Sequence, residues 1–267
     1  MYPALDSALN WSINQLQTSS SGSPHSRFIL LTDELSADGS FLIHHFIGRQ
    51  LKKDVTQSRV LLVGLAQSQD HYLNVGKKLG YNLTTSSRAS TFHFLDPLSP
   101  TIPVPSHTTD PKASQTFVQS LYKTIATKLL DTRATEGYAI SWSLIFDDIS
   151  LLLYSGIAVQ DVLWLVGACR ALIINLRGHL VVLSHADVTT TEDVEQTALN
   201  RSLGHMSDYM LEVRSLESGV THGVTGQLSL MKGPLLDDPN FHPQVLHYTI
   251  TDSCVQFSAK GYSGGVL

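Results

Sequence analysis

The chain of 267 residues is poor in charge and in cysteine, and it has no long uninterrupted apolar run. Charged residues make up 15% and hydrophobic residues 42%, a composition typical of globular proteins that excludes an intrinsically disordered chain. The net charge of -5 at pH 7 argues against a protein whose whole surface binds nucleic acid, although a local basic patch stays open. The first residues lack a basic region followed by an apolar one, so we expect no secretory signal.

The two cysteines, Cys169 and Cys254, stand far apart in apolar segments. Because there is no Cys-x-x-Cys motif and no Cys/His cluster, we expect no metal site, and we interpret both residues as buried reduced thiols of an intracellular protein. The most apolar segment, residues 144–176, is interrupted by Asp147, Asp148 and other polar residues. It therefore predicts a buried strand followed by a buried helix, and no membrane partner.

Strand-like and helix-like segments alternate up to about residue 205, and closely spaced strand-like segments follow. This order predicts an α/β fold with a mainly parallel central sheet flanked by helices, and with antiparallel strands toward the C-terminus. The predicted strands cover residues 28–33, 59–66, 91–95, 142–148, 179–185, 209–213, 226–231, 245–250 and 254–257. The predicted helices of the α/β part cover residues 39–53, 71–79, 117–130, 159–176 and 192–204.

A chain of this length is long enough for one large core, so we expect a single domain over residues 1–267. Within it, residues 1–26 predict an N-terminal helix followed by a flexible loop rich in serine and glycine. Residues 96–115 hold five prolines and predict a mobile loop.

The segment from residue 28 to residue 41 has the order strand, tight loop, helix that a phosphate-binding loop (P-loop) requires. A P-loop reads Gly, four residues, then Gly-Lys-Ser/Thr. On that template Glu34 replaces the first glycine and Gly39 is kept. Ser40 replaces the lysine and Phe41 replaces the hydroxyl that coordinates magnesium.

These replacements remove the chemistry that holds a nucleotide. Ser40 supplies no cation to the phosphates, and Phe41 supplies no metal ligand. Glu34 and Asp38 each add a carboxylate, which would repel a phosphate charge by roughly 3 kcal/mol at ~6 Å and an effective dielectric of ~20. This repulsion is larger than the ~0.3–2 kcal/mol by which a helix N-terminus attracts an anion. We therefore expect no tight ATP binding, no cofactor and no enzymatic activity. The alternative is an ordinary strand–helix turn that never held phosphate.

Three other groups of residues invite a catalytic interpretation. The apolar strand that ends in Asp147 and Asp148 is similar to a Walker B strand, which presents a carboxylate to magnesium, but a turn or helix-capping role explains Asp148 equally well. His44 and His45 would form a dyad, although we favour a half-buried pair packed behind the degenerate loop. Ser184, His185 and Asp147 are the residue types of a hydrolase triad, but no Gly-x-Ser-x-Gly motif accompanies them.

The order of these segments over nearly the whole chain resembles RecA-like ATPase folds with a degenerate nucleotide site. More specifically, the sequence resembles the Elongator complex protein 6 family. The residues that carry this resemblance are Leu30-Leu-Thr-Asp33, Asp38-Gly-Ser-Phe-Leu-Ile-His-His-Phe46, Val63-Gly-Leu-Ala-Gln-Ser68, His71-Tyr72 and Val75-Gly-Lys-Lys-Leu-Gly80.

The resemblance implies a function that composition alone does not reveal. Members of this family pair with Elongator subunits 4 and 5, which are RecA-like too, in a hetero-hexameric ring. The ring binds tRNA, associates with the remaining Elongator subunits and supports the addition of carboxymethyl-type groups to carbon 5 of the wobble uridine. We accordingly expect a structural, non-catalytic subunit in the cytoplasm, with the nucleus as a second location.

The family also suggests which residues face RNA or a neighbouring subunit. The loop at residues 186–192 would face the pore of a ring, where the hydroxyls of Thr189, Thr190 and Thr191 are candidates for tRNA contacts. A plain helix N-cap is the alternative for these threonines. The basic candidates for interface or phosphate contacts are Arg201, Arg214 and Lys232. Each of them is equally consistent with a solvated surface charge or a local ion pair.

Two further functions stay open on the sequence. One is a genuine ATPase with an unusual site, and the other is a RecA-like regulatory paralogue with no RNA role. The Asp-Gly-Ser-Phe and His-His-Phe residues favour the Elongator interpretation over both.

Overall fold

The computed structural model describes residues 5–6, 26–53, 58–97, 111–136, 140–187, 193–216, 223–237, 241–251 and 254–259. Most of the predicted N-terminal helix and loop at residues 1–26 therefore lies outside the described residues, as do residues 98–110 of the predicted proline-rich loop. That loop ends earlier than the sequence predicted, because a helix begins at Pro111. Proline is favoured at the first turn of a helix, where its missing N–H is not needed.

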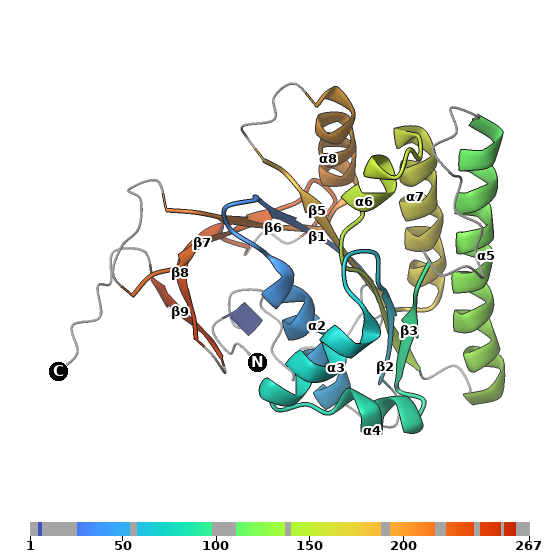
Figure 1. Cartoon of the computed structure of the whole chain (residues 1–267), viewed down its shortest axis with the longest axis horizontal. Helices are drawn as coiled ribbons and strands as arrows, with labels where there is room; N and C mark the ends of the chain where they lie inside the picture. Colours follow the sequence, from blue (N-terminus) through green and yellow to red (C-terminus); the bar gives the residue numbers. More distant parts are fainter. Residues whose placement is uncertain are drawn as a thin grey trace.

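One mixed sheet runs through the described part of the chain, in the strand order β3-β2-β4-β5-β1-β6-β7-β8-β9 (Figure 1). The strands from β1 to β6 pair in parallel, and those from β6 to β9 pair antiparallel. The predicted parallel sheet with an antiparallel C-terminal part is thus confirmed. The strands are β1 (Arg27–Asp33), β2 (Ser58–Val63), β3 (Phe92–Leu95), β4 (Ser141–Phe146), β5 (His179–His185), β6 (Tyr209–Arg214), β7 (Gly226–Lys232), β8 (Gln244–Ile250) and β9 (Val255–Ala259).

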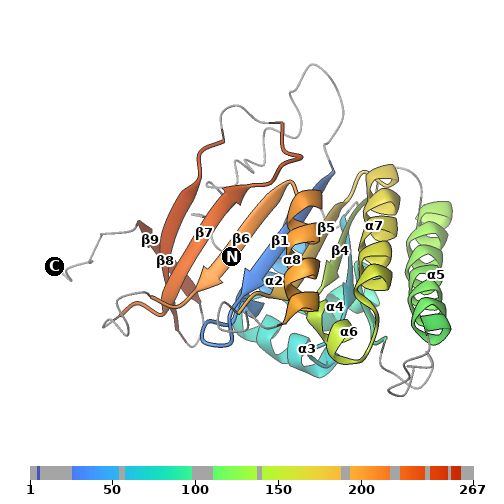
Figure 2. The same cartoon turned by 90° about the horizontal axis from the view of Figure 1, so that it is seen from above.

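Helices cover both faces of the parallel strands (Figures 1 and 2). On one face lie α2 (Ser40–Lys53), α3 (Gln69–Lys78) and α4 (Leu83–Arg88). On the other lie α5 (Pro111–Glu136), α6 (Ser150–Tyr154), α7 (Val159–Asn175) and α8 (Val194–Met206). The short helices α4 and α6 were not predicted, since six and five residues are too few to show a helical period. Among the described residues, none of the helices combines the length and apolarity that crossing a bilayer requires.

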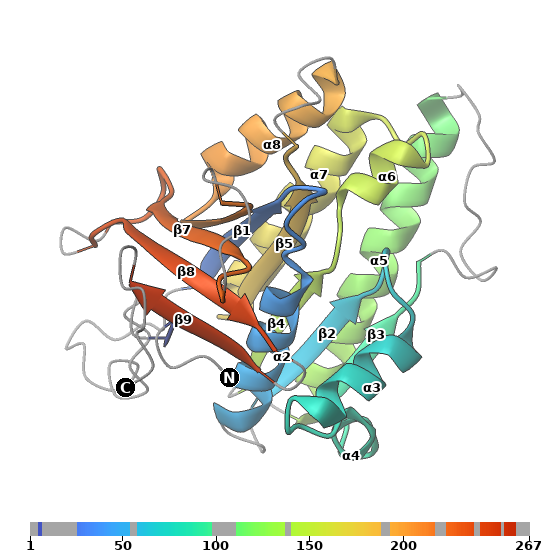
Figure 3. The ribbon, with the colours of Figure 1, turned by 60° about the vertical axis from the view of Figure 1, so that its left-hand side comes forward.

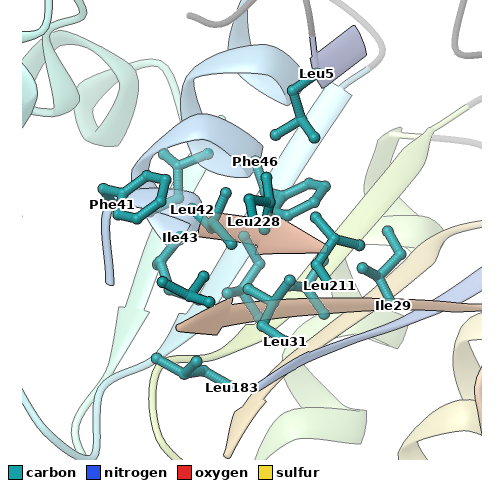
Figure 4. Close-up of a cluster of buried hydrophobic side chains, with 14 of the residues drawn as sticks. Leu5, Ile29, Leu31, Phe41, Leu42, Ile43, Phe46, Leu183, Leu211 and Leu228 are labelled. Atoms are coloured by element: carbon teal, nitrogen blue, oxygen red, sulfur yellow. The ribbon is translucent and has the colours of Figure 1, made fainter. Parts of the chain in front are cut away.

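Each face of the sheet has its own apolar core. On the α2 face, the antiparallel strands curve around this helix, so that Leu42 and Ile43 pack on strand residues such as Leu31 and Leu211 (Figures 3 and 4). On the opposite face, α5, α7 and α8 enclose a second core, which contains the fully buried Trp142. Each fully buried large apolar side chain stabilises the fold by roughly 1.5–3 kcal/mol.

The parallel register places the carboxyl ends of the strands side by side. Asp33 at the end of β1 lies beside His185 at the end of β5, and β4 ends next to β5 on the far side. The helix α2 follows β1 on one face, and α8 follows β5 on the other. The carboxyl end of the strands therefore gathers the loops in which α/β proteins of this kind bind ligands.

Candidate functional site

The loop between β1 and α2 is a tight turn. The Ala37 N–H donates to the Glu34 carbonyl at 2.9 Å, and the two residues form an isolated antiparallel bridge. Leu35 at the tip of this turn is 92% exposed. Gly39 fits the close packing at the end of this turn, because a Cβ there would lie only 3.1 Å from the Asp33 Cβ.

The N-terminus of α2 is capped by carboxylates of the chain itself. The Gly39 N–H donates to Asp33 Oδ2 at 2.8 Å, and the Ser40 N–H donates to Asp38 Oδ1 at 2.7 Å. The Ser40 hydroxyl donates to the second oxygen of Asp38 at 2.8 Å. Backbone N–H groups at a helix N-terminus are the donors that bind phosphate in a P-loop. Here two of them are already bonded to negative charge.

Phe41 serves the apolar core. Its ring is 8% exposed and packs against Tyr248 on β8, with centroids 5.0 Å apart, and against Phe257 on β9 at 6.3 Å. The side chain that replaces the magnesium-binding hydroxyl thus joins the helix to the antiparallel strands.

An ion-paired cluster of three residues closes the same edge of the sheet. The His185 ring bonds through Nδ1 to Asp33 Oδ1 and through Nε2 to Asp148 Oδ2, the latter at 3.0 Å. Hydrogen bonds to Asp148 and Asp33 raise the pKa of His185 to about 10, so the ring is an imidazolium at neutral pH. Burial raises the pKa of Asp33, while the bonds from His185 and Gly39 oppose that effect. We name Asp33, His185 and Asp148 the carboxylate–imidazolium cluster.

Asp147, the first carboxylate after β4, binds backbone. Its side chain accepts hydrogen bonds from the N–H groups of Leu65 at 2.6 Å, Ala66 at 3.1 Å and Gln67 at 3.1 Å. A fourth bond comes from the Tyr72 hydroxyl at 2.9 Å. With 2% exposure, this carboxylate holds the loop between β2 and α3 in place, whereas His185 pairs with Asp33 and Asp148.

Asp148 combines two bonds. Its Oδ1 accepts the Ser150 N–H at 2.9 Å, which starts α6, and its Oδ2 bonds to His185. Within the described part of the chain, no group of three or more His, Cys, Asp or Glu residues is arranged to hold a metal ion. Asp147 and Asp148 both bond to groups of the chain itself.

A polar network that the sequence analysis missed fixes the end of β5 to α8. Gln196 Nε2 donates to the His185 carbonyl at 2.6 Å and to Ser150 Oγ at 3.0 Å. Asn200 Nδ2 donates to the same carbonyl at 2.6 Å, and Ser184 Oγ donates to Asn200 Oδ1 at 2.6 Å. The signal in the sequence is a Gln and an Asn four residues apart on one face of the predicted helix.

The histidine pair of α2 is split between two environments. His44 Nδ1 lies 2.6 Å from the Tyr81 hydroxyl, while His45 Nε2 lies 3.4 Å from Asp6 Oδ1. Burial lowers the pKa of His44 to about 4, so this ring is neutral. Both residues are buried, more deeply than the half-buried pair that the sequence suggested.

The predicted contact residues are dispersed. Thr189, Thr190 and Thr191 lie outside the described residues. Arg201 is exposed on α8 and lines a pocket of about 280 Å³. Arg214 lies at the end of β6 near the turn after β1, with its Nε 3.6 Å from Glu34 Oε1, and it also pairs with Glu212.

Lys232 is separated from this edge. It ends β7 opposite Tyr209, the first residue of β6, and therefore lies at the other end of the sheet. Arg214 lies at the carboxyl edge of the strands, where it pairs with Glu34 and Glu212, and Arg201 shares a pocket with Ala186 and Asp187 after β5.

Negative charge predominates in four described loops at this edge, where the His185 imidazolium and Arg214 also lie. The described loops after β1, β2, β4 and β5 (residues 34–39, 64–68, 147–149 and 186–187) contain no lysine or arginine. They carry Glu34, Asp38, Asp147, Asp148 and Asp187. These loops offer a phosphate no lysine or arginine, and their carboxylates would repel it.

Known proteins match both the sequence and the fold. The profile of the family described as Elongation complex protein 6 matches residues 2–252. Elongator complex protein 6 of Rattus norvegicus is 32% identical over 278 residues, covering all of both chains. Elongator complex protein 6 of Homo sapiens is 32% identical over 267 residues, covering 95% of this chain and 98% of the relative.

Among solved structures, a KaiC-like protein from the hyperthermophilic archaeon Pyrococcus horikoshii OT3 superposes with a TM-score of 0.57. The similarity covers 89% of this chain and 91% of that one, at 8% sequence identity. Such low identity speaks for the fold alone, and it confirms the predicted RecA-like architecture.

Proposed function

This chain belongs to the Elongator complex protein 6 family, and from that membership we propose that it acts as a non-catalytic subunit of the Elongator complex. The observation that carries the non-catalytic part is the capping of α2. The N–H groups that would hold a phosphate donate instead to Asp33 and Asp38. The neighbouring imidazolium of His185 is in turn held by two carboxylates.

The chain is thus a pseudo-ATPase in this proposal, with Ser40 and Phe41 at the positions of the P-loop lysine and hydroxyl. The carboxylates of Asp33 and Asp38 bond to the N–H groups that a phosphate would use, and Phe41 packs in the core. The N-terminus of α2 is therefore capped without a ligand. A RecA-like regulatory paralogue, or an ATPase with an unusual site, is the alternative that the following experiments address.

We further propose that the chain assembles with Elongator subunits 4 and 5 into a hetero-hexameric ring that binds tRNA and supports wobble-uridine modification. Exposed apolar side chains at the carboxyl edge of the sheet support the proposal that the chain binds other subunits. Leu35 is 92% exposed and Val194, the first residue of α8, is 74% exposed. Large apolar side chains in such positions are typical of surfaces that meet other proteins.

Co-expression with subunits 4 and 5 tests this assembly. We expect one complex in which all three chains co-purify, with a mass that corresponds to six RecA-like chains. The Leu35→Glu variant is compared with the native chain. It places a charge on the exposed turn and should weaken the assembly without unfolding the chain. A stable monomer that ignores both partners would contradict the proposal.

Nucleotide binding by the isolated chain tests the pseudo-ATPase. We expect millimolar Mg-ATP to leave the thermal unfolding midpoint unchanged. A site with nucleotide at 100 times its dissociation constant would stabilise the chain by about 2.7 kcal/mol and raise the midpoint by roughly 5 °C or more. Inorganic phosphate at equal ionic strength is the control. A shift specific to ATP would favour the alternative of an unusual ATPase.

A further inference from the structure

The outer surface of α7 carries an apolar stripe that nothing in the described part of the chain covers. The helix lies between α5 and α8 on one face of the sheet, with its outer side turned away from the strands (Figure 2). Trp164 and Ile174 on this helix are 45% and 46% exposed, and Leu130 on the adjacent α5 is 45% exposed.

The stripe follows the helical period. Trp164, Gly167, Ala171 and Ile174 succeed one another at intervals of three, four and three residues, so they share one side of α7. The opposite side is formed by the buried residues of the helix, such as Leu165. At Gly167 an added Cβ would meet nothing within 4 Å, so the space outside this position is open. The small residues Gly167 and Ala171 thus form the middle of the stripe, and the large side chains of Trp164 and Ile174 form its two ends.

One end of the stripe packs against α5. The Tyr122 ring of α5 meets the Trp164 ring edge-on, with centroids 5.6 Å apart. A ring fixed in this way loses little conformational entropy when a partner covers it. Single exposed apolar residues are common on protein surfaces, but an aligned and partly immobilised row of them indicates a contact surface.

Basic residues outnumber acidic ones around the stripe, in a chain whose net charge is -5. Lys123 follows Tyr122 on α5 and is exposed, Arg170 is half-buried on α7, and Arg177 is exposed just beyond the end of α7. The carboxylates nearby are that of Asp161 on α7, which accepts a hydrogen bond from the Ser114 hydroxyl of α5, and that of Asp131, which is exposed beside Leu130 on α5. The surroundings therefore favour a partner with negative charge.

We propose that this surface, the α5/α7 face, binds an amphipathic helix of a partner protein. The apolar side of that helix packs on Trp164, Ala171 and Ile174, and the small residues of α7 allow a close approach. Acidic residues on its flanks pair with the basic residues that border the stripe. A peptide fits better than RNA because the centre of the stripe is uncharged and apolar, whereas phosphates need cations along their whole path. This inference goes beyond subunit membership, since it names the surface and the chemistry of its occupant.

A photo-crosslinking experiment in the assembled complex tests the occupant. Benzoylphenylalanine replaces Trp164 in the chain purified with Elongator subunits 4 and 5, and the control carries it at Ile250, which has the same 46% exposure as Ile174 but lies on β8. We expect a crosslink from position 164 to a partner helix whose apolar side is bordered by Asp or Glu. A crosslink only to tRNA or to a second copy of this chain, or none at all, would overturn the inference.

A peptide-binding experiment tests the chemistry without knowledge of the partner. The probe is a designed labelled helix with leucines at positions i, i+3, i+4 and i+7 and glutamates on its flanks, measured by fluorescence anisotropy with the full chain. We expect the Trp164→Glu and Ile174→Glu variants to bind at least about tenfold more weakly, as expected for residues at the centre of an interface, while Ile250→Glu binds normally. The same helix with lysines in place of glutamates should bind more weakly than the acidic probe.

Equal binding of all variants, or of both probes, would overturn the inference. All three substituted side chains are exposed, so circular dichroism should show an unchanged fold. Failure of co-purification would refute the proposed subunit role. Co-purification without a protein crosslink from position 164 would refute the α5/α7 face alone.

Discussion

Replacing Asp147 with alanine is expected to lower the free energy of unfolding by about 3 kcal/mol, because it leaves buried donors without an acceptor. Three backbone N–H groups of the loop after β2 and the Tyr72 hydroxyl donate to this carboxylate. The side chain is 2% exposed, so water cannot easily replace it. Urea unfolding followed by circular dichroism measures the loss, with the midpoint falling at constant slope if the native state stays intact.

Two control variants distinguish this clamp from an ordinary surface carboxylate. Asp147→Asn keeps the volume and one acceptor oxygen, so its loss should be smaller than that of Asp147→Ala. Asp38→Ala removes an exposed cap of α2 and should lower the free energy of unfolding by about 1 kcal/mol. If Asp147→Ala destabilises no more than Asp38→Ala, the carboxylate does not hold the loop, and a role toward a ligand would have to be reconsidered.

The sequence was sufficient for the class of the fold. Continuous apolar runs such as residues 60–63 reveal strands buried on both faces, and the later alternating segments reveal antiparallel ones. Boundaries were less accurate: the predicted strand at 142–148 ends at Phe146, because Asp147 and Asp148 leave the strand to bond with loops on either side. The order of the strands in the sheet cannot be predicted from local periodicity, and this order determines which loops lie next to one another.

The candidate site shows this limit most clearly. The degenerate loop was visible because Glu34 to Phe41 are contiguous and align with a known spacing. The carboxylate–imidazolium cluster was not, since Asp33 and His185 are 152 residues apart and meet only because β1 pairs with β5. The triad interpretation, which the lack of a Gly-x-Ser-x-Gly motif disfavoured, would have paired His185 with Asp147, the first of two adjacent carboxylates. The backbone turn after β4 directs Asp147 to the β2–α3 loop and Asp148 to the imidazole.

The degenerate loop and the carboxylate–imidazolium cluster have the same effect: they place charges of the chain where a P-loop protein would bind an anion. A helix N-terminus and a cluster of loops at the carboxyl edge of a parallel sheet form a place of positive potential that attracts an anion. In this chain Asp38 and Asp33 supply that negative charge from within, and His185 supplies the cation that lets Asp33 and Asp148 lie close together. An edge satisfied in this way stays folded without nucleotide, as a structural subunit requires.

Replacing His185 with alanine is the sharpest test of this arrangement. It leaves Asp33 and Asp148, both buried, as neighbouring carboxylates without a counter-charge. Breaking a buried ion pair costs about 3–5 kcal/mol. The His185 side chain is 40% exposed and solvent screens part of the interaction, so we expect a loss near 2 kcal/mol in urea unfolding. His205→Ala, an exposed histidine on α8, is the control and should change stability by less than about 0.5 kcal/mol.

The pH dependence of this difference identifies its cause. The pKa of His185 is raised from 6.5 to about 10 in the folded chain, so the folded state holds a proton that the unfolded state releases. The stabilisation is therefore fully present below about pH 6.5 and declines as pH rises toward about 10. We expect the stability of the native chain to exceed that of His185→Ala most at about pH 6 and least at about pH 10. A difference that stays constant over this range would mean that the ring acts by packing alone, and that no imidazolium holds the two carboxylates together.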